Sequence, residues 1–460
     1  MTPTGRKKLV TAVDTMAADL LTPLAVYLIL SAKSERSFLL ESVEGGKALA
    51  RYSFIGSEPE SVAAGGKEAF EQVRAQVEEY FVEAAADLPS FIGGAIGYLG
   101  FDACEWFDQG IKPAETDGEC AFMFYRTVVA FDHARQLIKI ISLAEEGDID
   151  AAEQRNSKVR EALLSAGLSA AALAPNAAAA DDVPRITSNW ARHDLEAAVE
   201  AVKEMILAGE CYQVVLSQCF TRPTTADAVS IYRALRSINP SPYMFLLDLG
   251  DKQIIGASPE MLLRVTGRKI EYRPIAGTRR RGASADEDAR LAEEMRKDPK
   301  EVSEHMMLVD LGRNDLGRVS EYGSVSVDSL MHVEKYSHVQ HLVSSVSATL
   351  RNGLDRFDAL AACFPAGTVS GAPKVRSIEI IRELEPDRRG VYAGTVGYFD
   401  HSGNLDACIA IRTVVLQNGV ARIQAGAGIV ADSVPSSEYE ETVNKAKGIL
   451  RAIDIAEGRQ

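Results

Sequence analysis

Apolar residues recur along this chain in short runs that alternate with segments of helical period. In the first third, the runs predict strands over Phe38–Leu40, Arg51–Ile55, Phe91–Tyr98, Met123–Phe131 and Leu137–Ser142. A period near 3.6 predicts helices over Lys67–Val82 and Ile149–Ala166. The apolar run Leu20–Ala32 is shorter than the roughly 20 residues that a membrane helix needs, so it predicts a buried segment.

Later in the chain, strands follow one another with few helices between them. Helices are predicted over Asp194–Ala208, over Ala226–Ile238 and from Ser437 onward. Strands are predicted over Tyr212–Phe220, Tyr243–Leu247, Gln253–Ala257, Met261–Thr266, Lys269–Pro274, Thr395–Phe399, Ala407–Val415 and Ala421–Ala425. Consecutive strands without crossover helices argue against a purely parallel sheet. The pattern therefore predicts an α+β fold with large, mainly antiparallel sheets and helices packed outside.

An alanine-rich segment divides the chain. Residues 166–184 contain two prolines and no amphipathic period, which is typical of an exposed linker. The predicted organisation is an N-terminal part over 1–165, the linker, and a second part over 185–460. Gly94–Asp102 resembles Gly394–Asp400, which suggests two related sheets that face each other.

The charge balance excludes several classes of partner. The chain has 50 Lys and Arg against 65 Asp and Glu, a formal net charge of −15. An acidic surplus argues against binding to nucleic acid or to an anionic membrane. Six cysteines without a C-x-x-C pair predict reduced, mostly buried thiols and a cytoplasmic location.

Two predicted helix starts carry paired carboxylates. Glu301 and Glu304 follow Asp298-Pro299, and Glu438 and Glu441 follow a probable cap at Ser437. Carboxylates from two helix starts that met across a cleft could hold Mg²⁺. The alternative is ordinary helix capping and surface charge, and spacing alone leaves both open.

For the other candidate residues, a functional role and a purely structural role are both open. The glycine-rich segments Pro274–Gly282 and Gly426–Gly428 are predicted to form turns whose N–H groups bind oxygen atoms, or else simple turns. Arg412 could form a bidentate contact with a carboxylate. Glu260 could donate a proton from a partly dry site, or be a turn carboxylate, and His341 could be catalytic or structural.

Four longer motifs favour a functional interpretation of these residues over a structural one. They are His305–Gly317 (HMMLVDLGRNDLG), Pro274–Arg279 (PIAGTR), Cys363–Lys374 (CFPAGTVSGAPK) and Gln424–Val430 (QAGAGIV). Together they strongly resemble the chorismate-utilising enzymes, which include anthranilate, aminodeoxychorismate, isochorismate and salicylate synthases. The resemblance spans nearly the whole chain and implies a four-layer α/β/β/α fold with two sheets packed face to face.

The resemblance also implies roles for the candidate residues. Glu304 and Glu441 would hold Mg²⁺, with Glu301 and Glu438 in support. Glu260 would help the ring hydroxyl leave, and His341 would lie beside the ring during proton removal. The residues implied around chorismate are Gly277, Thr278, Tyr392, Arg412, Gly426, Ala427, Gly428 and Lys445.

Two positions favour one reaction within the family. Members that add water carry a lysine base where this chain has Gln213, and an amide cannot deprotonate water. Some aminodeoxychorismate synthases carry a nucleophilic lysine where this chain has Ala276. Direct attack of ammonia on C2 is therefore expected, followed by pyruvate loss to give anthranilate. The alternatives are an enzyme that stops at aminodeoxychorismate and a tryptophan-binding regulator without catalysis.

The same resemblance implies an effector and a partner. Leu39–Val43 and Asn239–Met244 resemble the tryptophan feedback pocket of anthranilate synthases, which Ser42, Pro242, Tyr243 and Met244 would line. The chain has no G-x-C-x-G nucleophile elbow for splitting glutamine. A glutamine amidotransferase subunit is therefore expected to supply the ammonia.

Overall fold

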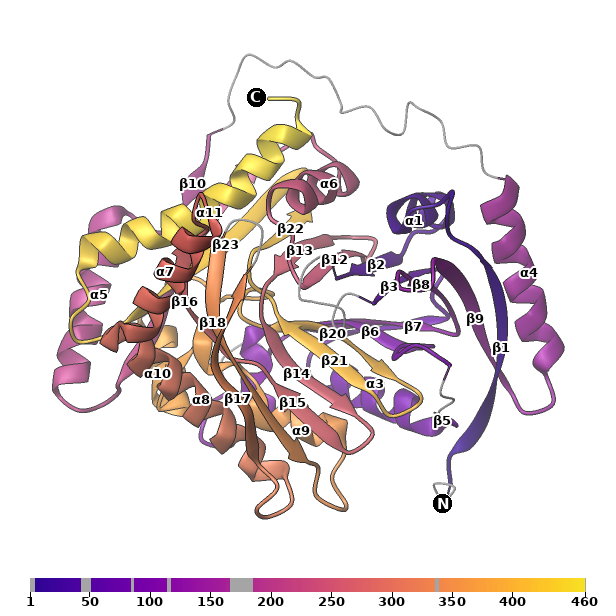
Figure 1. Ribbon diagram of the computed structural model, residues 1–460, viewed down its shortest axis with the longest axis horizontal. Coiled ribbons are helices and arrows are strands. Elements are labelled where there is room, and N and C mark those ends of the chain that lie inside the picture. The colour runs from indigo at the N-terminus through magenta and orange to yellow at the C-terminus, as the bar shows by residue number, and fades with distance from the viewer. Residues whose placement is uncertain are drawn as a thin grey trace.

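Two large sheets form the centre of the molecule (Figure 1). The computed structural model describes residues 5–42, 51–83, 87–113, 117–165, 185–335 and 339–459. Among them, paired strands run antiparallel except for the parallel pair of β1 and β5. The predicted linker, 166–184, lies outside the described residues.

The larger sheet has 13 described strands. Its order is β10 (Thr187–Ser188), β11 (Gln213–Pro223), β23 (Val420–Ile429), β22 (Thr413–Gln417), β13 (Gln253–Ser258), β12 (Tyr243–Asp248), β2 (Ser37–Glu41), β3 (Tyr52–Ser57), β8 (Thr127–Asp132), β9 (Leu137–Glu145), β1 (Lys7–Ala17) and β5 (Tyr80–Val82), with β19 (Gly371–Ala372) paired to β11.

The smaller sheet has 10 described strands. Its order is β16 (Ile275–Arg280), β18 (Val339–Thr349), β15 (Lys269–Tyr272), β14 (Met261–Thr266), β21 (Leu405–Ile409), β20 (Thr395–Asp400), β6 (Gly94–Leu99), β7 (Cys120–Tyr125) and β4 (Ser61–Gly65), with β17 (Ser326–Lys335) paired to β18.

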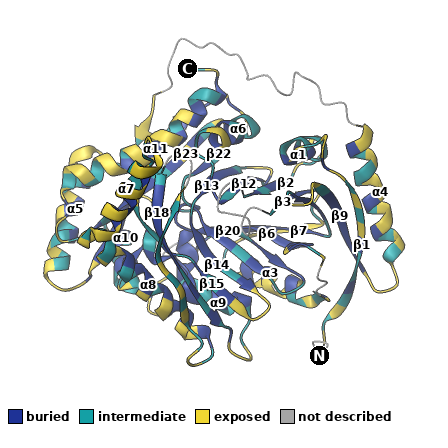
Figure 2. Cartoon of the chain, viewed as in Figure 1, coloured by how far each residue is buried: buried dark blue, intermediate teal, exposed yellow. Residues whose placement is uncertain are grey.

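Helices cover the outer faces of both sheets, so the predicted four-layer α+β fold is confirmed. Phe38 and Phe245 of the larger sheet pack against Ile96, Met123 and Tyr398 of the smaller one in a shared core. Helices α1 (Pro23–Ser31), α4 (Ile149–Ser165), α6 (Ala228–Ile238) and α11 (Pro435–Ala456) pack on the larger sheet, and α3 (Lys67–Glu79), α8 (Pro299–Val319) and α9 (Arg356–Cys363) on the smaller one. Helices α5 (Arg192–Leu207) and α10 (Lys374–Leu384) pack on β11, and α7 (Ala285–Lys297) lies on β16. Figure 2 shows buried strands between helices with exposed outer faces.

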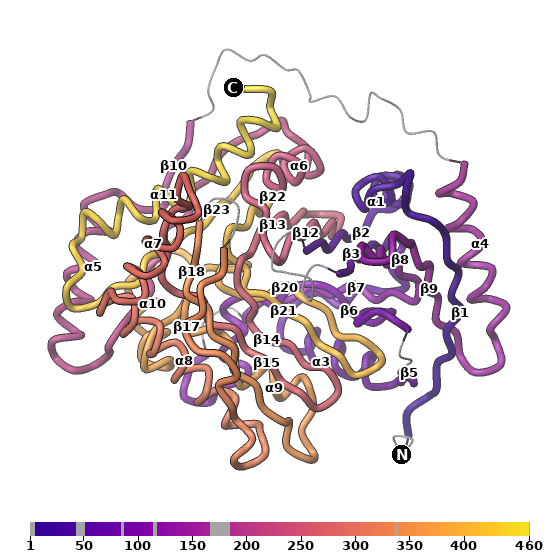
Figure 3. Tube along the Cα trace, viewed as in Figure 1, coloured from indigo at the N-terminus to yellow at the C-terminus, as the bar shows by residue number. Residues whose placement is uncertain are grey.

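The parts before and after the linker interleave rather than forming separate domains. Both sheets contain strands from 1–165 and from 185–460. Figure 3 shows the early strands reaching the centre of the molecule, where β6 lies beside β20. The two similar glycine-containing segments are thus antiparallel neighbours, with Gly97 opposite Gly397, and the expectation that they lie in facing sheets is wrong.

Two predicted strands are each divided between the sheets. The run Met123–Phe131 contains the end of β7 and most of β8, which belong to different sheets. The run Ala407–Val415 is divided in the same way between β21 and β22, and Arg412 between them has a φ of 50°. Because apolar residues resume within two positions after Arg126 and Arg412, hydrophobic pattern alone does not reveal where a strand leaves one sheet for the other.

The N-terminal basic run begins a strand that the sequence reading missed. Within Lys7–Ala17, the first three residues pair with β5, and the strand pairs with β9 from Leu9 to Ala17. The predicted helix over Lys67–Val82 ends at Glu79, and Tyr80–Val82 forms β5. Tyr, Phe and Val favour a strand at this point. Lys7 forms an ion pair with Glu79, so the basic run binds the acidic end of α3.

The six cysteines are free thiols and all are buried, which confirms their expected structural role. No helix in the described ranges is long and apolar enough to cross a membrane. The run Leu20–Ala32 contains the short helix α1, in which Pro23, Val26 and Tyr27 are buried.

Candidate active site

A cavity of about 730 Å³ brings together most of the predicted site residues. Both sheets line it, together with the first turns of α8 and α11. The predicted residues among its walls are Glu260, Thr278, Glu304, His341, Tyr392, Arg412, Gly426, Gly428, Glu438, Glu441 and Lys445.

Three predicted residues do not line the cavity but lie next to residues that do. Ala427 points into the core because side chains alternate along β23, which leaves Gly426 and Gly428 on the cavity side. The carboxylate of Glu301 forms an ion pair with Arg279, with 2.6 Å between Oε1 and Nη1. Gly277 contributes its carbonyl oxygen to His341.

Two helix starts aim their carboxylates at the cavity. Asp298 caps α8, with Oδ1 accepting from the Lys300 N–H at 3.0 Å, and Pro299 occupies the first position as expected. Helix α11 begins at Pro435, after Val434, so the predicted cap at Ser437 is wrong. Pro435 sets the φ angle of the first turn, and Ser437 lies inside that turn.

Burial and neighbouring charge disfavour the ionised form of two of these carboxylates, Glu304 and Glu438. Burial raises the pKa of Glu304, and the charges of Glu301 and Glu441 raise it further. Burial and Glu441 also raise the pKa of Glu438. Lys445 binds Glu441 with 2.7 Å between Nζ and Oε1. The cavity therefore concentrates negative charge that a cation would relieve.

This donor set fits Mg²⁺ rather than a metal enclosed by protein. Within the described ranges, no three His, Cys, Asp or Glu side chains form a metal-binding group. Mg²⁺ commonly uses one or two carboxylates and completes its shell with water and substrate oxygens. Glu304 and Glu441, from separate helices on one cavity, match that requirement.

Glu260 has the properties of a proton donor. It lies just before β14 and is buried in the cavity wall. Burial raises the pKa of Glu260 to about 8, while the Thr368 hydroxyl and the charge of Lys445 offset part of the rise. Its carboxyl group is therefore mostly protonated at pH 7 and can give a proton to a leaving oxygen.

His341 is held as a neutral imidazole. Its Nδ1 lies 3.0 Å from the Gly277 carbonyl oxygen and 3.0 Å from Thr278 Oγ1. Because a carbonyl oxygen only accepts, Nδ1 carries the proton and Nε2 is the basic nitrogen. Burial lowers the pKa of His341, which keeps the ring neutral.

The two glycine-rich segments are strands, not the predicted turns. Gly277 sits at a register shift in β16 with a φ of 67°, which turns its carbonyl toward His341. A Cβ on Gly426 would come within 2.7 Å of the Tyr392 hydroxyl, and one on Gly428 within 2.6 Å of Gln213 Nε2. A Cβ at position 426 would also lie 2.9 Å from the Leu216 carbonyl oxygen, so the backbone itself excludes a side chain there, whereas the flexible Gln213 side chain could move away from one at position 428.

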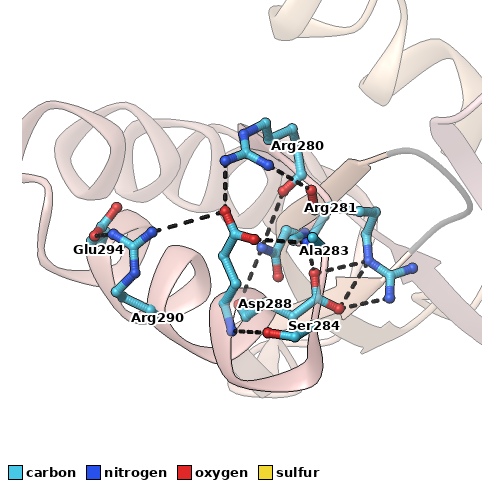
Figure 4. A network of polar contacts seen from close by, with 10 residues as sticks. Arg280, Arg281, Ala283, Ser284, Asp288, Arg290 and Glu294 are labelled. Carbon is cyan, nitrogen blue, oxygen red and sulfur yellow. Dashed lines mark hydrogen bonds and ion pairs between the residues drawn. The ribbon is translucent and has the colours of Figure 1, made fainter.

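An ion-pair network fastens the end of β16 to α7 (Figure 4). Asp288 accepts from the Gly282 N–H at 2.6 Å and pairs with Arg281 at 2.7 Å. Ser284 caps α7 by accepting from the Glu287 N–H. These bonds hold the pKa of Asp288 well below its usual range. They anchor the strand that carries Gly277 and Thr278.

The walls also include residues that were not predicted as site residues, among them Lys300, Gln424 and Thr368. Lys300 and Gln424 belong to α8 and β23, and Thr368 lies in the short 3₁₀ helix η3 (Gly367–Val369). Thr368 is part of the motif Cys363–Lys374, so the motif marked the segment without indicating which side chain faces the cavity.

A second cavity of about 370 Å³ contains all four predicted effector residues. Ser42, Pro242, Tyr243 and Met244 line it. The other walls include aromatic side chains and the charged groups Glu41, Arg51 and Arg264. The Tyr243 hydroxyl donates to Asp406 at 3.1 Å, and Arg264 binds the same carboxylate at 2.6 Å.

Comparison with known proteins identifies the family. The model of the chorismate binding enzymes matches residues 35–451. This chain belongs to the chorismate-binding enzyme family. The cavity that holds Glu260, Arg412 and the helix-start carboxylates is thus the candidate active site of a chorismate-binding enzyme.

Relatives within the chorismate-binding enzymes cover almost the whole chain. Anthranilate synthase component 1 of Acetivibrio thermocellus is 44% identical over 95% of this chain and 94% of its own length. The protein of the same name from Thermus thermophilus is 44% identical over 96% and 97%. The structure of anthranilate synthase component I from Streptococcus pneumoniae has 35% identity and a TM-score of 0.77, covering 94% of this chain and 98% of that one. A menaquinone-specific isochorismate synthase from Escherichia coli shares the fold at 19% identity, with a TM-score of 0.74 over 98% and 96%.

The raised pKa of Glu260 predicts a pH-dependent difference between the wild type and Glu260→Gln. The folded state holds this proton up to about pH 8, whereas the unfolded chain loses it near its ordinary value of 4.5. The wild type is therefore expected to lose stability between about pH 4.5 and 8, and the amide avoids that loss. Melting temperatures measured in steps over this range should favour Glu260→Gln increasingly as pH rises. Parallel melting curves for the two proteins would contradict the assignment.

Proposed function

We propose that this chain is the large subunit of an anthranilate synthase. It converts chorismate and ammonia to anthranilate and pyruvate in tryptophan biosynthesis. The observation that carries the proposal is Gln213, whose amide lines the candidate active site where water-adding relatives would have a lysine base. The names of the full-length relatives support the same activity.

Each step of the amination can be assigned to a residue of the cavity. Arg412 binds a substrate carboxylate, and Glu260 gives its proton to the C4 hydroxyl, which leaves as water. Ammonia attacks C2 without a base, whereas water would need one. Gln213 Oε1 is buried without a hydrogen-bond partner in the described part of the chain, so it can accept an N–H from ammonia.

Pyruvate loss then creates the aromatic ring. The C2 proton passes to the basic nitrogen of His341 while the ether bond between the ring and the enolpyruvyl group breaks. The enolpyruvate that leaves takes up a proton and becomes pyruvate. Glu304 and Glu441 would hold Mg²⁺, with Glu438 beside them and Glu301 behind them on Arg279. Mg²⁺ supplies positive charge that orients the substrate carboxylate.

Tryptophan is the proposed inhibitor, bound in the second cavity. Aromatic walls suit its indole ring, and Arg51, Arg264 and Glu41 offer partners for its carboxylate and ammonium groups. This cavity is separate from the one that contains Glu260. Inhibition from there requires that tryptophan and chorismate favour different arrangements of the chain.

The ammonia source is proposed to be a glutamine amidotransferase subunit. The sequence has no glutamine-splitting elbow, and the relatives are named as one component of an assembly. Reduced thiols and a biosynthetic role fit the cytoplasm.

Product analysis tests the proposed reaction. Purified protein with chorismate, Mg²⁺ and ammonium is expected to form fluorescent anthranilate and an equal amount of pyruvate. Glutamine in place of ammonium should give product only after the amidotransferase subunit is added. Accumulation of aminodeoxychorismate would identify the other aminating activity, and tryptophan binding with unchanged chorismate would identify a regulator.

The metal assignment predicts that Glu304→Gln and Glu441→Gln abolish Mg²⁺-dependent turnover. Each substitution removes a charged ligand, so turnover should fall at least about 100-fold, equivalent to roughly 2.7 kcal/mol of transition-state stabilisation. Calorimetry should show weaker Mg²⁺ binding, and the melting temperature should stay near that of the wild type. Glu440→Gln is the matched control, because Glu440 binds Arg192 on the helix surface. Wild-type turnover in either cavity variant would refute the metal site.

The effector assignment predicts that Ser42→Ala weakens tryptophan inhibition. Ser42 lines only the second cavity of the two, so turnover without tryptophan should be unchanged. Loss of one hydrogen bond should raise the inhibitory concentration about 5- to 10-fold. Inhibition curves for both proteins at one chorismate concentration provide the measurement, and coincident curves would disprove the assignment.

A further inference from the structure

One carboxylate of the acidic helix starts is turned away from the candidate active site. Glu301 and Glu304 lie three residues apart near the start of α8, so their side chains leave neighbouring positions on one face of the helix. Glu304 lines the cavity, whereas Glu301 does not. Glu301 Oε1 binds Arg279 Nη1 at 2.6 Å, and Oε2 lies against Gly277, 3.1 Å from the place that a Cβ would occupy. The contacts of Glu301 are therefore with β16.

Arg279 holds Glu301 through several bonds of one guanidinium group. Its Nη1 also donates to the Thr278 carbonyl oxygen at 3.0 Å, and its Nη2 binds Asp298 Oδ2 at 3.0 Å. Asp298 caps α8 with its other carboxylate oxygen. The planar guanidinium thus joins β16 to the cap and to the third residue of α8, and its rigid shape fixes the direction of the Glu301 carboxylate.

The second helix start has a looser ion pair. Lys445 Nζ lies 2.7 Å from Glu441 Oε1, but the two side chains are 49% and 47% exposed. Arg279 and Glu301 are only 28% and 20% exposed. A single ammonium group in an exposed pair contributes little stability and can release its partner, whereas a guanidinium with several fixed bonds holds its partner more firmly. A cation in the cavity would therefore recruit Glu441, which lines it, more readily than Glu301.

We propose that Arg279 is a positioning residue that keeps Glu301 from binding the metal ion directly. Mg²⁺ takes about six oxygen ligands in an octahedral arrangement. Each protein carboxylate among them tightens the binding of the ion and leaves one place fewer for substrate. Because Glu301 is held on Arg279, places remain for the oxygens of a substrate carboxylate. The inference rests on the proposed function, in which Glu304 and Glu441 hold Mg²⁺, and adds the residue that limits how many carboxylates take part.

Magnesium binding without substrate tests this role. Calorimetric titration with MgCl₂ gives the Kd for the wild type, Arg279→Gln, Glu301→Gln and the double variant. In Arg279→Gln, the released Glu301 can turn toward the ion, so the Mg²⁺ Kd is expected to fall about 5-fold or more. In Glu301→Gln, the Kd should stay within about 3-fold of the wild type, whereas Glu304→Gln should raise it at least about 10-fold. Adding Arg279→Gln to Glu301→Gln should then change the Kd less than about 2-fold.

Two further variants separate the position of Glu301 from the charge of Arg279. Arg280→Gln removes a guanidinium from the next position of β16, but Arg280 binds Glu287 of α7 (Figure 4), so the Mg²⁺ Kd should match that of the wild type. Arg279→Lys keeps the charge and loses the planar set of bonds, so the Mg²⁺ Kd should fall in this variant as it does in Arg279→Gln.

The outcomes distinguish this inference from the proposed function. An unchanged Kd in Arg279→Gln overturns the inference alone, and if that variant does not fold, an unchanged Kd in Arg279→Lys overturns it. Binding that weakens as much in Glu301→Gln as in Glu304→Gln would show that Glu301 is already a direct ligand. Equal tightening by Arg279→Gln with and without Glu301 would show an effect of charge alone and would also refute the positioning role. Wild-type protein that binds no Mg²⁺ overturns the proposed metal site and the inference together.

Discussion

The convergence of acidic residues from two helix starts on one cavity is the constraint on which the rest of the site depends. Glu304 comes from α8, which packs on the smaller sheet, and Glu441 comes from α11, which packs on the larger one. Each helix contributes only one of these two charges. Like charges in a partly buried cavity destabilise the fold, so other contacts must keep them close together. The packing of the two sheets must hold them in place, and the core around Phe38, Phe245 and Tyr398 supplies that packing.

The remaining site groups are arranged around this charge. Glu260 is buried deeply enough to keep its proton. Lys445 binds Glu441 and donates a hydrogen bond to the Gly426 carbonyl oxygen. Arg412 lies at the crossing between the sheets and provides positive charge in the same cavity as the acidic helix starts. A substrate with carboxylates can thus join the acidic and basic walls, with a divalent cation completing the acidic side.

The sequence predicted the fold class, and most of the predicted site residues line one cavity. The predictions that failed have physical reasons. The family resemblance implied roles for Glu260, Glu304 and His341, and the structure places all three on one cavity. Periodicity failed where a strand passes from one sheet to the other, since apolar residues are required on both sides of Arg126 and Arg412. Ala427 was grouped with its glycine neighbours because the segment was expected to turn, whereas a strand sends alternate residues to opposite faces.

The interleaving of early and late strands has a consequence for how the chain becomes folded. The Ile92 N–H donates to Asp400, 308 residues later, and β6 is paired with β20 on one side. Contacts of such long sequence separation close slowly, because a large loop entropy is lost before they form. During synthesis, β6 must wait with an open edge until the last quarter of the chain emerges. Until then the open edge can pair with strands of other chains, which exposes the unfinished protein to aggregation.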